Sequence, residues 1–170
     1  MSSFNTRFYN FTKEWAASDE RLMHTDEDPS VFLCNSFMSR IQTLQHVGPE
    51  KEYLIMIDIN RAKSDSPNLY RNNTLSIFFC CRAHEFTDFE NLNEALDRAE
   101  ELMDDFTGYL VSECKKAKKS KDDHVLKMMS DNQEFPADTI APYDGGWCCY
   151  EMIINIPTNI CRTPTSQHRI

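Results

Sequence analysis

The chain has 170 residues, near the usual size of one domain, and its 27 acidic and 18 basic side chains give a formal net charge of −9. Hydrophobic residues make up 41% of the chain and aromatic residues 11%, which is too apolar for a disordered protein. The negative charge argues against a general nucleic-acid binder, because that class displaces counterions from phosphates with basic surface. No apolar run approaches the roughly 20 residues that cross a bilayer, and the N-terminus lacks the apolar core of a secretory signal. We therefore expect an intracellular protein with no membrane partner.

The cysteines predict neither a disulfide framework nor a metal site. They stand at positions 34, 80, 81, 114, 148, 149 and 161. Their number is odd and two pairs are adjacent, so we expect reduced thiols in the core. No cysteine or histidine spacing matches a zinc site. With only four glycines in the chain, a phosphate-binding loop is not expected either, so the sequence predicts no cofactor.

The first part of the chain predicts two helices and a short strand. Four aromatic residues, Phe4, Phe8, Phe11 and Trp15, recur at helical spacing and predict a helix that runs to about Ser18 and docks by an aromatic stripe. Residues 31–47 have mixed spacing, which we interpret as a short strand followed by a helix around residues 36–44.

Two strands follow, with a long connection between them. Residues 53–59 alternate, with Asp58 expected on a solvent-facing side, and a second alternating strand begins at Thr74. Arg61 to Asn73 is rich in Ser, Asp, Asn and Pro and is long for a hairpin connection, so we expect a functional loop there.

A long amphipathic helix is the clearest predicted element. It starts at Thr87 to Glu90, where Thr and Glu have capping-box spacing, and its apolar stripe continues to Leu110. Its outer face is first acidic, at Glu94, Asp97, Glu100, Glu101, Asp104 and Asp105. It then becomes basic, at Lys115, Lys116, Lys118, Lys119 and Lys121. This order suits the helix dipole. The lysines form either a solvated helix end or a contact with DNA or with the acidic face of a neighbouring copy.

The last third predicts a final strand and a tail. The region with Pro136, Pro142 and Gly145-Gly146 has turn chemistry, and residues 147–156 alternate as a strand that ends at Pro157. The whole pattern predicts an α+β fold in which a mainly antiparallel sheet packs against the N-terminal helix and the long helix. We expect one domain over residues 1–157 and a polar tail over residues 158–170.

No residue stands out as catalytic, so we do not expect an enzyme. A nuclease could be assembled from Asp58, Glu85 and a lysine, because carboxylates near strand ends can hold magnesium. Nothing in the sequence fixes that geometry. Cys114 fits the inner stripe of the long helix, where a helix C-terminus would raise a thiol pKa, so it is not a candidate nucleophile.

The order of elements resembles that of the tail-terminator and neck proteins of bacteriophages, especially a divergent group from phages and prophages of gut bacteria. The elements that carry the resemblance are the N-terminal helix, the strand at 53–59, Asn72-Asn73 before the strand at 75–81, the helix over 88–116, Gly146-Trp147 and the closing strand with Pro157.

The resemblance implies a virion structural protein, made in the host cytoplasm, that catalyses nothing. Such subunits form a ring, commonly of six copies, that closes the tail tube and joins it to the head-side connector, with DNA only as passing cargo. By position in the element order, the predicted interface residues are Arg61, Lys63, Tyr70, Arg71, Asn72, Glu94, Glu101 and Asp105. Within the Arg61 to Asn73 loop, Tyr70 and Arg71 would be the anchors, because aromatic and arginine side chains dominate interfaces. An intracellular protein-binding module, such as an adaptor, immunity protein or chaperone, is the alternative.

Overall fold

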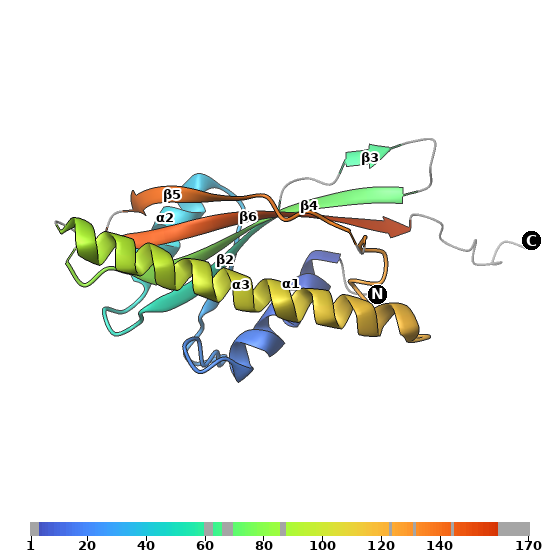
Figure 1. Cartoon of the computed structure of the whole chain (residues 1–170), viewed down its shortest axis with the longest axis horizontal. Helices are drawn as coiled ribbons and strands as arrows, with labels where there is room; N and C mark the ends of the chain where they lie inside the picture. The colour runs from blue at the N-terminus through green and yellow to red at the C-terminus, as the bar shows by residue number, and fades with distance from the viewer. Residues whose placement is uncertain are drawn as a thin grey trace, which may run out of the picture.

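The computed structural model describes residues 4–59, 63–65, 70–85, 88–122, 124–130, 132–143 and 145–159 (Figure 1). The elements in chain order are α1 (Phe4–Ser18), β1 (Val31–Cys34), α2 (Phe37–His46), β2 (Tyr53–Ile59), β3 (Lys63–Asp65), β4 (Tyr70–Arg82), α3 (Phe89–Lys119), β5 (Ala137–Tyr143) and β6 (Trp147–Asn159). The fold is α+β, as the sequence predicted.

The strands form one mixed sheet in the order β1-β2-β4-β6-β5, with the short β3 pairing β4. Only β1 and β2 run parallel, joined through α2, and the remaining pairs are antiparallel. The longest ladder joins β4 to β6 over the full length of both strands, from Tyr70↔Asn159 to Arg82↔Trp147. The start of β2, the end of β4 and the start of β6 therefore meet at one end of the sheet.

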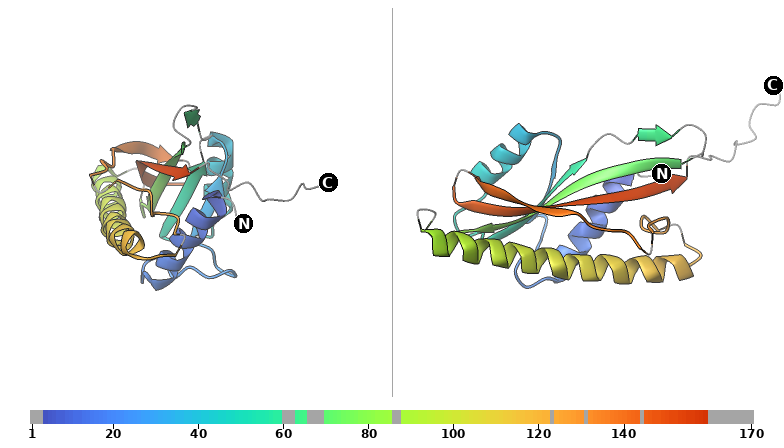
Figure 2. Two further views of the ribbon diagram at one scale, coloured as in Figure 1. Left: turned by 90° about the vertical axis from the view of Figure 1, so that its right-hand side faces the viewer. Right: turned by 45° about the horizontal axis from the view of Figure 1, so that its top comes forward.

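Helices cover both faces of the sheet (Figure 2). Alternation along each strand sends Ile55, Phe79 and Met152 to the face that α1 and α3 cover. It sends Leu54 and Phe78 to the opposite face, where α2 packs. The sheet is thus buried on both sides, which explains why its central strands carry apolar residues at nearly every position.

The aromatic stripe of α1 docks in the core, as predicted, and its main partner is α3. The Phe106 ring lies fully buried between α1 and the sheet, with ring centroids 5.0 Å from Trp15, 5.4 Å from Phe79 and 6.3 Å from Phe11. The Tyr9 hydroxyl donates a hydrogen bond to the Val31 carbonyl, 3.3 Å away, which ties α1 to the edge strand β1. These aromatic contacts join α1 to α3, and α3 to the sheet.

The predicted strand and helix at 31–47 are confirmed as β1 and α2. Ser36 caps α2 by accepting a hydrogen bond from the Ser39 N–H, and Leu44 is its buried anchor. The prediction that Asp58 faces solvent was wrong: it is 8% exposed and forms an ion pair with Arg40 of α2. The reason is that α2 covers the face of β2 that carries Asp58, and the carboxylate then needs a charged partner.

Three predicted boundaries differ from the structure. Tyr70 to Asn73 belong to β4 and not to a loop, because this segment pairs β6 and its first three residues also pair β3. Residues 137–143, which include Pro142, form the edge strand β5 instead of a turn region. The ladder also continues past Pro157, which lies opposite Asn72, so Thr158 and Asn159 belong to β6 and the rest of the predicted tail lies outside the described residues. In each case strand pairing outweighs local propensity.

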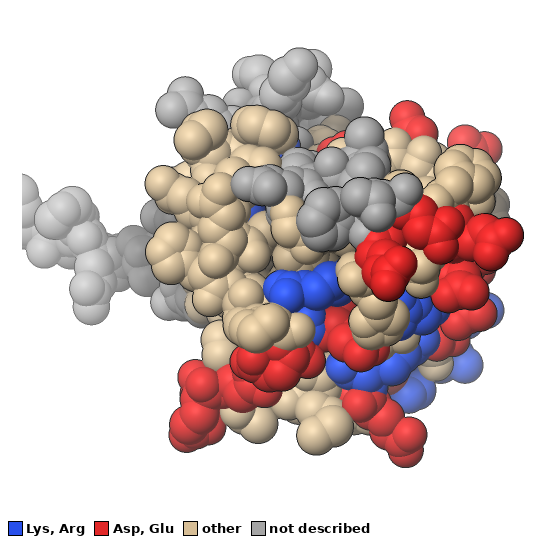
Figure 3. All heavy atoms as spheres, turned by 90° about the vertical axis from the view of Figure 1, so that its left-hand side faces the viewer, with Lys and Arg blue, Asp and Glu red and all other residues tan. Residues whose placement is uncertain are grey.

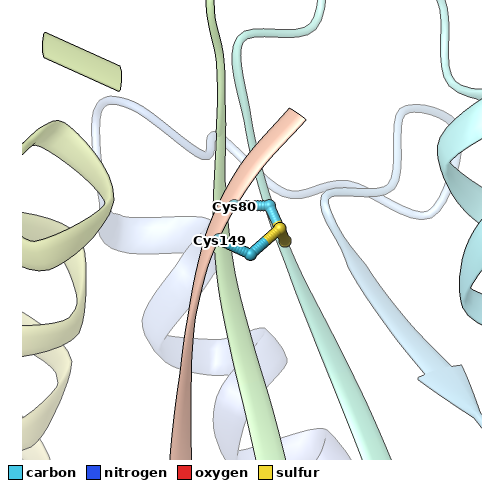
Figure 4. The surroundings of a disulfide bond; sticks show 2 residues. All are labelled: Cys80 and Cys149. Carbon is cyan, nitrogen blue, oxygen red and sulfur yellow. A yellow bond between two sulfur atoms is a disulfide. The ribbon is translucent and has the colours of Figure 1, made fainter. Parts of the chain in front are cut away.

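The prediction of reduced thiols was wrong for one pair of cysteines. Cys80 and Cys149 form a disulfide across β4 and β6, with Cα atoms 4.2 Å apart (Figure 4). The two adjacent cysteine pairs run antiparallel, so Cys80 faces Cys149 on one side of the sheet while Cys81 lies opposite Cys148 on the other. Cys81 and Cys148 are buried free thiols, and burial raises the pKa of Cys81 to about 11. The second pair therefore stays protonated at neutral pH.

His24 is held neutral inside the loop between α1 and β1. Its Nδ1 accepts hydrogen bonds from the N–H groups of Ser30 (2.9 Å) and Val31 (3.1 Å), so the ring proton sits on Nε2. A second proton would break both bonds. Burial, reinforced by the nearby Lys13 ammonium, lowers the pKa of His24 below the ordinary histidine value.

We predict that Phe106→Ala lowers the free energy of unfolding by about 3 to 5 kcal/mol, because it leaves a cavity between α1, α3 and β4. Phe89→Ala is the matched control on the same helix, since Phe89 is 73% exposed, and it should change stability by less than about 0.5 kcal/mol. Urea unfolding measures both values. Equal losses in the two variants would contradict the proposed core.

We predict that reduction of the disulfide lowers the free energy of unfolding by about 2 to 4 kcal/mol. The bond joins residues 69 positions apart, so it removes a large part of the conformational freedom of the unfolded chain. Equilibrium unfolding with and without reductant measures this difference. The effect should persist in the Cys81→Ala/Cys148→Ala variant and vanish in Cys80→Ala/Cys149→Ala; a reductant effect that survives the second pair of substitutions would argue against this bond.

His24 predicts a loss of stability in mild acid. The unfolded chain binds a proton to this histidine near its ordinary pKa of about 6.5, whereas the folded chain binds it more weakly. The stabilisation is therefore complete above about pH 6.5 and decreases below it, by at most about 1.4 kcal/mol per pH unit. Urea unfolding at several pH values tests this, with His24→Asn as the variant whose side chain can still accept a bond but cannot titrate. A pH slope unchanged by the substitution would refute the assignment.

Candidate interaction surfaces

The helix α3 carries an acidic strip along its first half. Asp88 caps the helix by accepting a hydrogen bond from the Glu90 N–H, so the N-cap is Asp88 and not the predicted Thr87, which lies outside the described residues. The strip is the set of exposed carboxylates on the outer face of this half. Its members are Glu90, Glu94, Asp97, Glu100, Glu101, Asp104 and Asp105.

Among the predicted interface residues in this strip, Asp105 already has an intramolecular role. Its carboxylate lies 2.7 Å from the guanidinium of Arg21, which also binds Asp19 at 2.6 Å. This bridge fastens the loop after α1 to the long helix. Glu94 and Glu101 are exposed, so of the three they are the better candidates for contact with another molecule.

The last turns of α3 form a lysine cluster, made of Lys115, Lys116, Lys118, Lys119 and Lys121. The helix ends at Lys119 with Ser120 as its C-cap, where positive side chains suit the negative end of the helix dipole. Lys116 is paired with Glu113 at 2.6 Å, while Lys115, Lys119 and Lys121 are exposed. At about 1.5 Å per residue, the 31 residues of α3 extend for about 46 Å. The start of the helix and the lysine cluster therefore lie at opposite ends of the molecule (Figure 1).

The end of the molecule where α3 begins is rich in charge (Figure 3). Glu52 binds Arg98 of α3 at 3.5 Å and lies 3.9 Å from the His84 ring. Arg98 also donates a hydrogen bond to the Arg82 carbonyl. This cluster fixes α3 to the end of β4.

The predicted interface residues of the long connection lie mostly on two paired strands. Lys63 lies in β3, while Tyr70, Arg71 and Asn72 lie at the start of β4. Their register pairs Lys63 with Asn72, so these residues form a ribbon with β6. The side chain of Asn72 is exposed, and Arg61 lies outside the described residues.

The proposed magnesium ligands do not come together. Asp58 lies near the last residues of β2, whereas Glu85 follows the end of β4, which pairs with the start of β2. The two carboxylates thus belong to opposite ends of the sheet, and Asp58 already binds Arg40. Within the described part of the chain, no group of three or more His, Cys, Asp or Glu side chains is placed to hold a metal ion. Cys114 is buried in the inner stripe of α3, as predicted.

A cavity of about 490 Å³ lies beside α2, at the end of the sheet where β2 begins. Sequence inspection missed it, because its wall combines residues from three separate segments: the entry of β1, the helix α2 and the return from α2 to β2. Three large apolar side chains are exposed near the opposite end of α2: Leu33, Phe37 and Met38. No motif marks either feature.

No protein-family model matches the chain, and comparison with curated proteins finds no match. Among the described residues, none of the helices is both long and apolar enough to cross a bilayer.

Proposed function

We propose that the chain is a structural subunit that assembles head to tail into a ring, of the kind that closes the tail tube of a phage or joins it to the head-side connector. The observation that carries the proposal is the opposite charge of the two ends of α3. The acidic strip and the lysine cluster lie too far apart within one copy to neutralise each other, since the Debye length at physiological salt is about 8 Å.

In a head-to-tail contact the lysine cluster of one copy would meet the acidic strip of the next. Such a contact uses two different surfaces, so it generates a ring if the rotation between copies closes. Complementary charge of this kind favours rapid and correctly oriented association. The ribbon of β3, β4 and β6 would remain available for the tail tube or the connector.

Two further features support a place in a virion. The net charge of −9 suits a channel through which DNA passes without sticking. The disulfide Cys80–Cys149 suits a particle that leaves the reducing cytoplasm in which it is made, because disulfides persist in oxidising surroundings.

A protein-binding module that acts as a monomer or dimer is the second candidate. The cavity beside α2 and the exposed Leu33, Phe37 and Met38 favour it, because exposed apolar groups and concave sites are features of binding surfaces. The two candidates differ in whether the pure protein forms a larger assembly through the two ends of α3.

Charge reversal tests the ring. We predict that Lys115→Glu/Lys119→Glu and, separately, Glu94→Lys/Glu101→Lys weaken self-association, because each introduces like charges into the contact and reduces the attraction between the two surfaces. A mixture of the two variants should associate more strongly than either variant alone, since the introduced carboxylates of one copy then meet the introduced ammonium groups of the next around a ring with an even number of copies. Light scattering during size-exclusion chromatography gives the masses.

Two controls complete this test. Glu27→Lys changes an exposed charge away from α3 and should leave the mass unchanged. Raising the salt concentration from about 0.1 M to about 1 M should dissociate the native assembly, because the Debye length falls from about 10 Å to about 3 Å. A native protein that is monomeric at every concentration and salt, or an assembly insensitive to both reversals, would refute the head-to-tail ring and favour the binding module.

A further inference from the structure

The lining of the cavity beside α2 is mixed. Phe32 and Val47, which pack against the smaller core cluster, and Pro29 supply an apolar wall. The polar part of the lining includes Gln42, Thr43 and His46, and its charged members are Asp28, Glu50 and Lys51. A volume of about 490 Å³ falls within the range of small-molecule sites.

The charged side chains of the lining do not cancel, because it contains two carboxylates, Asp28 and Glu50, and one ammonium group, Lys51. Lys51 forms an ion pair with Asp28. Its Nζ lies 2.6 Å from the Asp28 carboxylate and 3.4 Å from the Asp28 carbonyl oxygen. The side chain of Lys51 is only 12% exposed, whereas that of Asp28 is 72% exposed. Glu50 is the second carboxylate of the lining and adds a negative charge that Lys51 does not offset.

Glu50 is turned back over the chain. Its carboxylate occupies the space where a side chain on Gly48 would stand. The Glu50 side chain is exposed, so a larger residue at position 48 would displace the carboxylate and not the backbone. Glu50 also lines the partly apolar cavity and gives it a negative group.

The neighbouring polar groups present lone pairs. The Thr43 hydroxyl donates its hydrogen to the Ser39 carbonyl, and His46 Nδ1 donates to the Gln42 carbonyl at 2.6 Å. The Thr43 oxygen, which also lies 3.8 Å from the Cys34 Sγ, keeps a lone pair that can accept a further hydrogen bond. Together with Glu50 it gives the lining two acceptors for a ligand that carries donors.

We infer that this cavity binds an organic cation, a primary ammonium or guanidinium group on an aliphatic stem. The stem would contact the apolar wall and the cation would bind Glu50, with the Thr43 hydroxyl oxygen accepting a further hydrogen bond. Such a group occurs in free alkyl diamines and in lysine or arginine side chains of a protein. The inference does not depend on the ring.

Calorimetric titration of the whole chain tests this inference with matched probes. The free cations are 1,5-diaminopentane and 4-aminobutylguanidine, and 1,5-pentanediol is the neutral analogue of the first. The protein source is represented by a peptide of residues 112–122 of this chain and by the same peptide with every lysine replaced by glutamine. We expect a cationic probe to bind and its neutral counterpart not to bind.

The variants identify the site. Glu50→Gln should weaken binding by about tenfold or more, because a charge-assisted hydrogen bond is lost. Gly48→Ala should weaken it too, by displacing the Glu50 carboxylate, while Glu27→Gln, an exposed carboxylate outside the cavity, should bind as the native chain does. Far-ultraviolet circular dichroism checks that each variant is folded.

Each outcome of the titrations either supports or overturns binding of an organic cation. Binding of a free cation, lost in Glu50→Gln, supports a small-molecule ligand, and binding of the lysine peptide alone, lost in the same variant, supports a protein side chain. Equal binding of the neutral analogue, binding unaffected by Glu50→Gln, or no binding of any probe would overturn the inference. None of these results bears on self-association, which the charge-reversal variants of α3 test separately.

Discussion

The pairing of β4 with β6 is the constraint on which the rest of the structure depends. Thirteen residues of each strand pair in one register, from Tyr70↔Asn159 to Arg82↔Trp147. This ladder places β2 on one side of β4 and β5 on the far side of β6, and it offers the long apolar strip against which α3 lies. A slip of one residue would exchange the two faces of a strand and separate Cys80 from Cys149. The disulfide therefore fixes the same register that the apolar core selects.

The uneven distribution of charge along the molecule follows from the way α3 lies along the β4–β6 ladder. Because α3 extends along a ladder of such length, its acidic first half and its lysine cluster come to lie at opposite ends. Charges arranged in this order stabilise an isolated helix through its dipole, and that alone accounts for their sequence. On a rigid elongated domain the same order also creates two complementary surfaces, which is what a head-to-tail assembly needs.

The cavity beside α2 is a separate consequence of the parallel β1-α2-β2 unit. The return from α2 to β2 brings residues 48–51 next to the entry of β1, and the Lys51–Asp28 pair closes this corner. Glu50 belongs to the same return and lines the cavity. Acidic surface at one end of the molecule and an acidic cavity mouth thus arise from different elements, and their partners can be tested independently.

Local pattern determined much of the fold: the aromatic spacing of α1, the alternation of β2 and β6 and the stripe of α3 each appear in the sequence because one face of each element must be apolar. It could not reveal β5 or the extension of β4 to Tyr70, since these polar segments are strands only through their partners. Asp58 and His24 became buried because α2 and the loop after α1 supply their partners from elsewhere in the chain. The acidic strip, the lysine cluster and their separation along one helix follow from the sequence itself. The pairing of Cys80 with Cys149 and the cavity at Glu50 were decided only by tertiary structure, because each depends on which distant residues become neighbours.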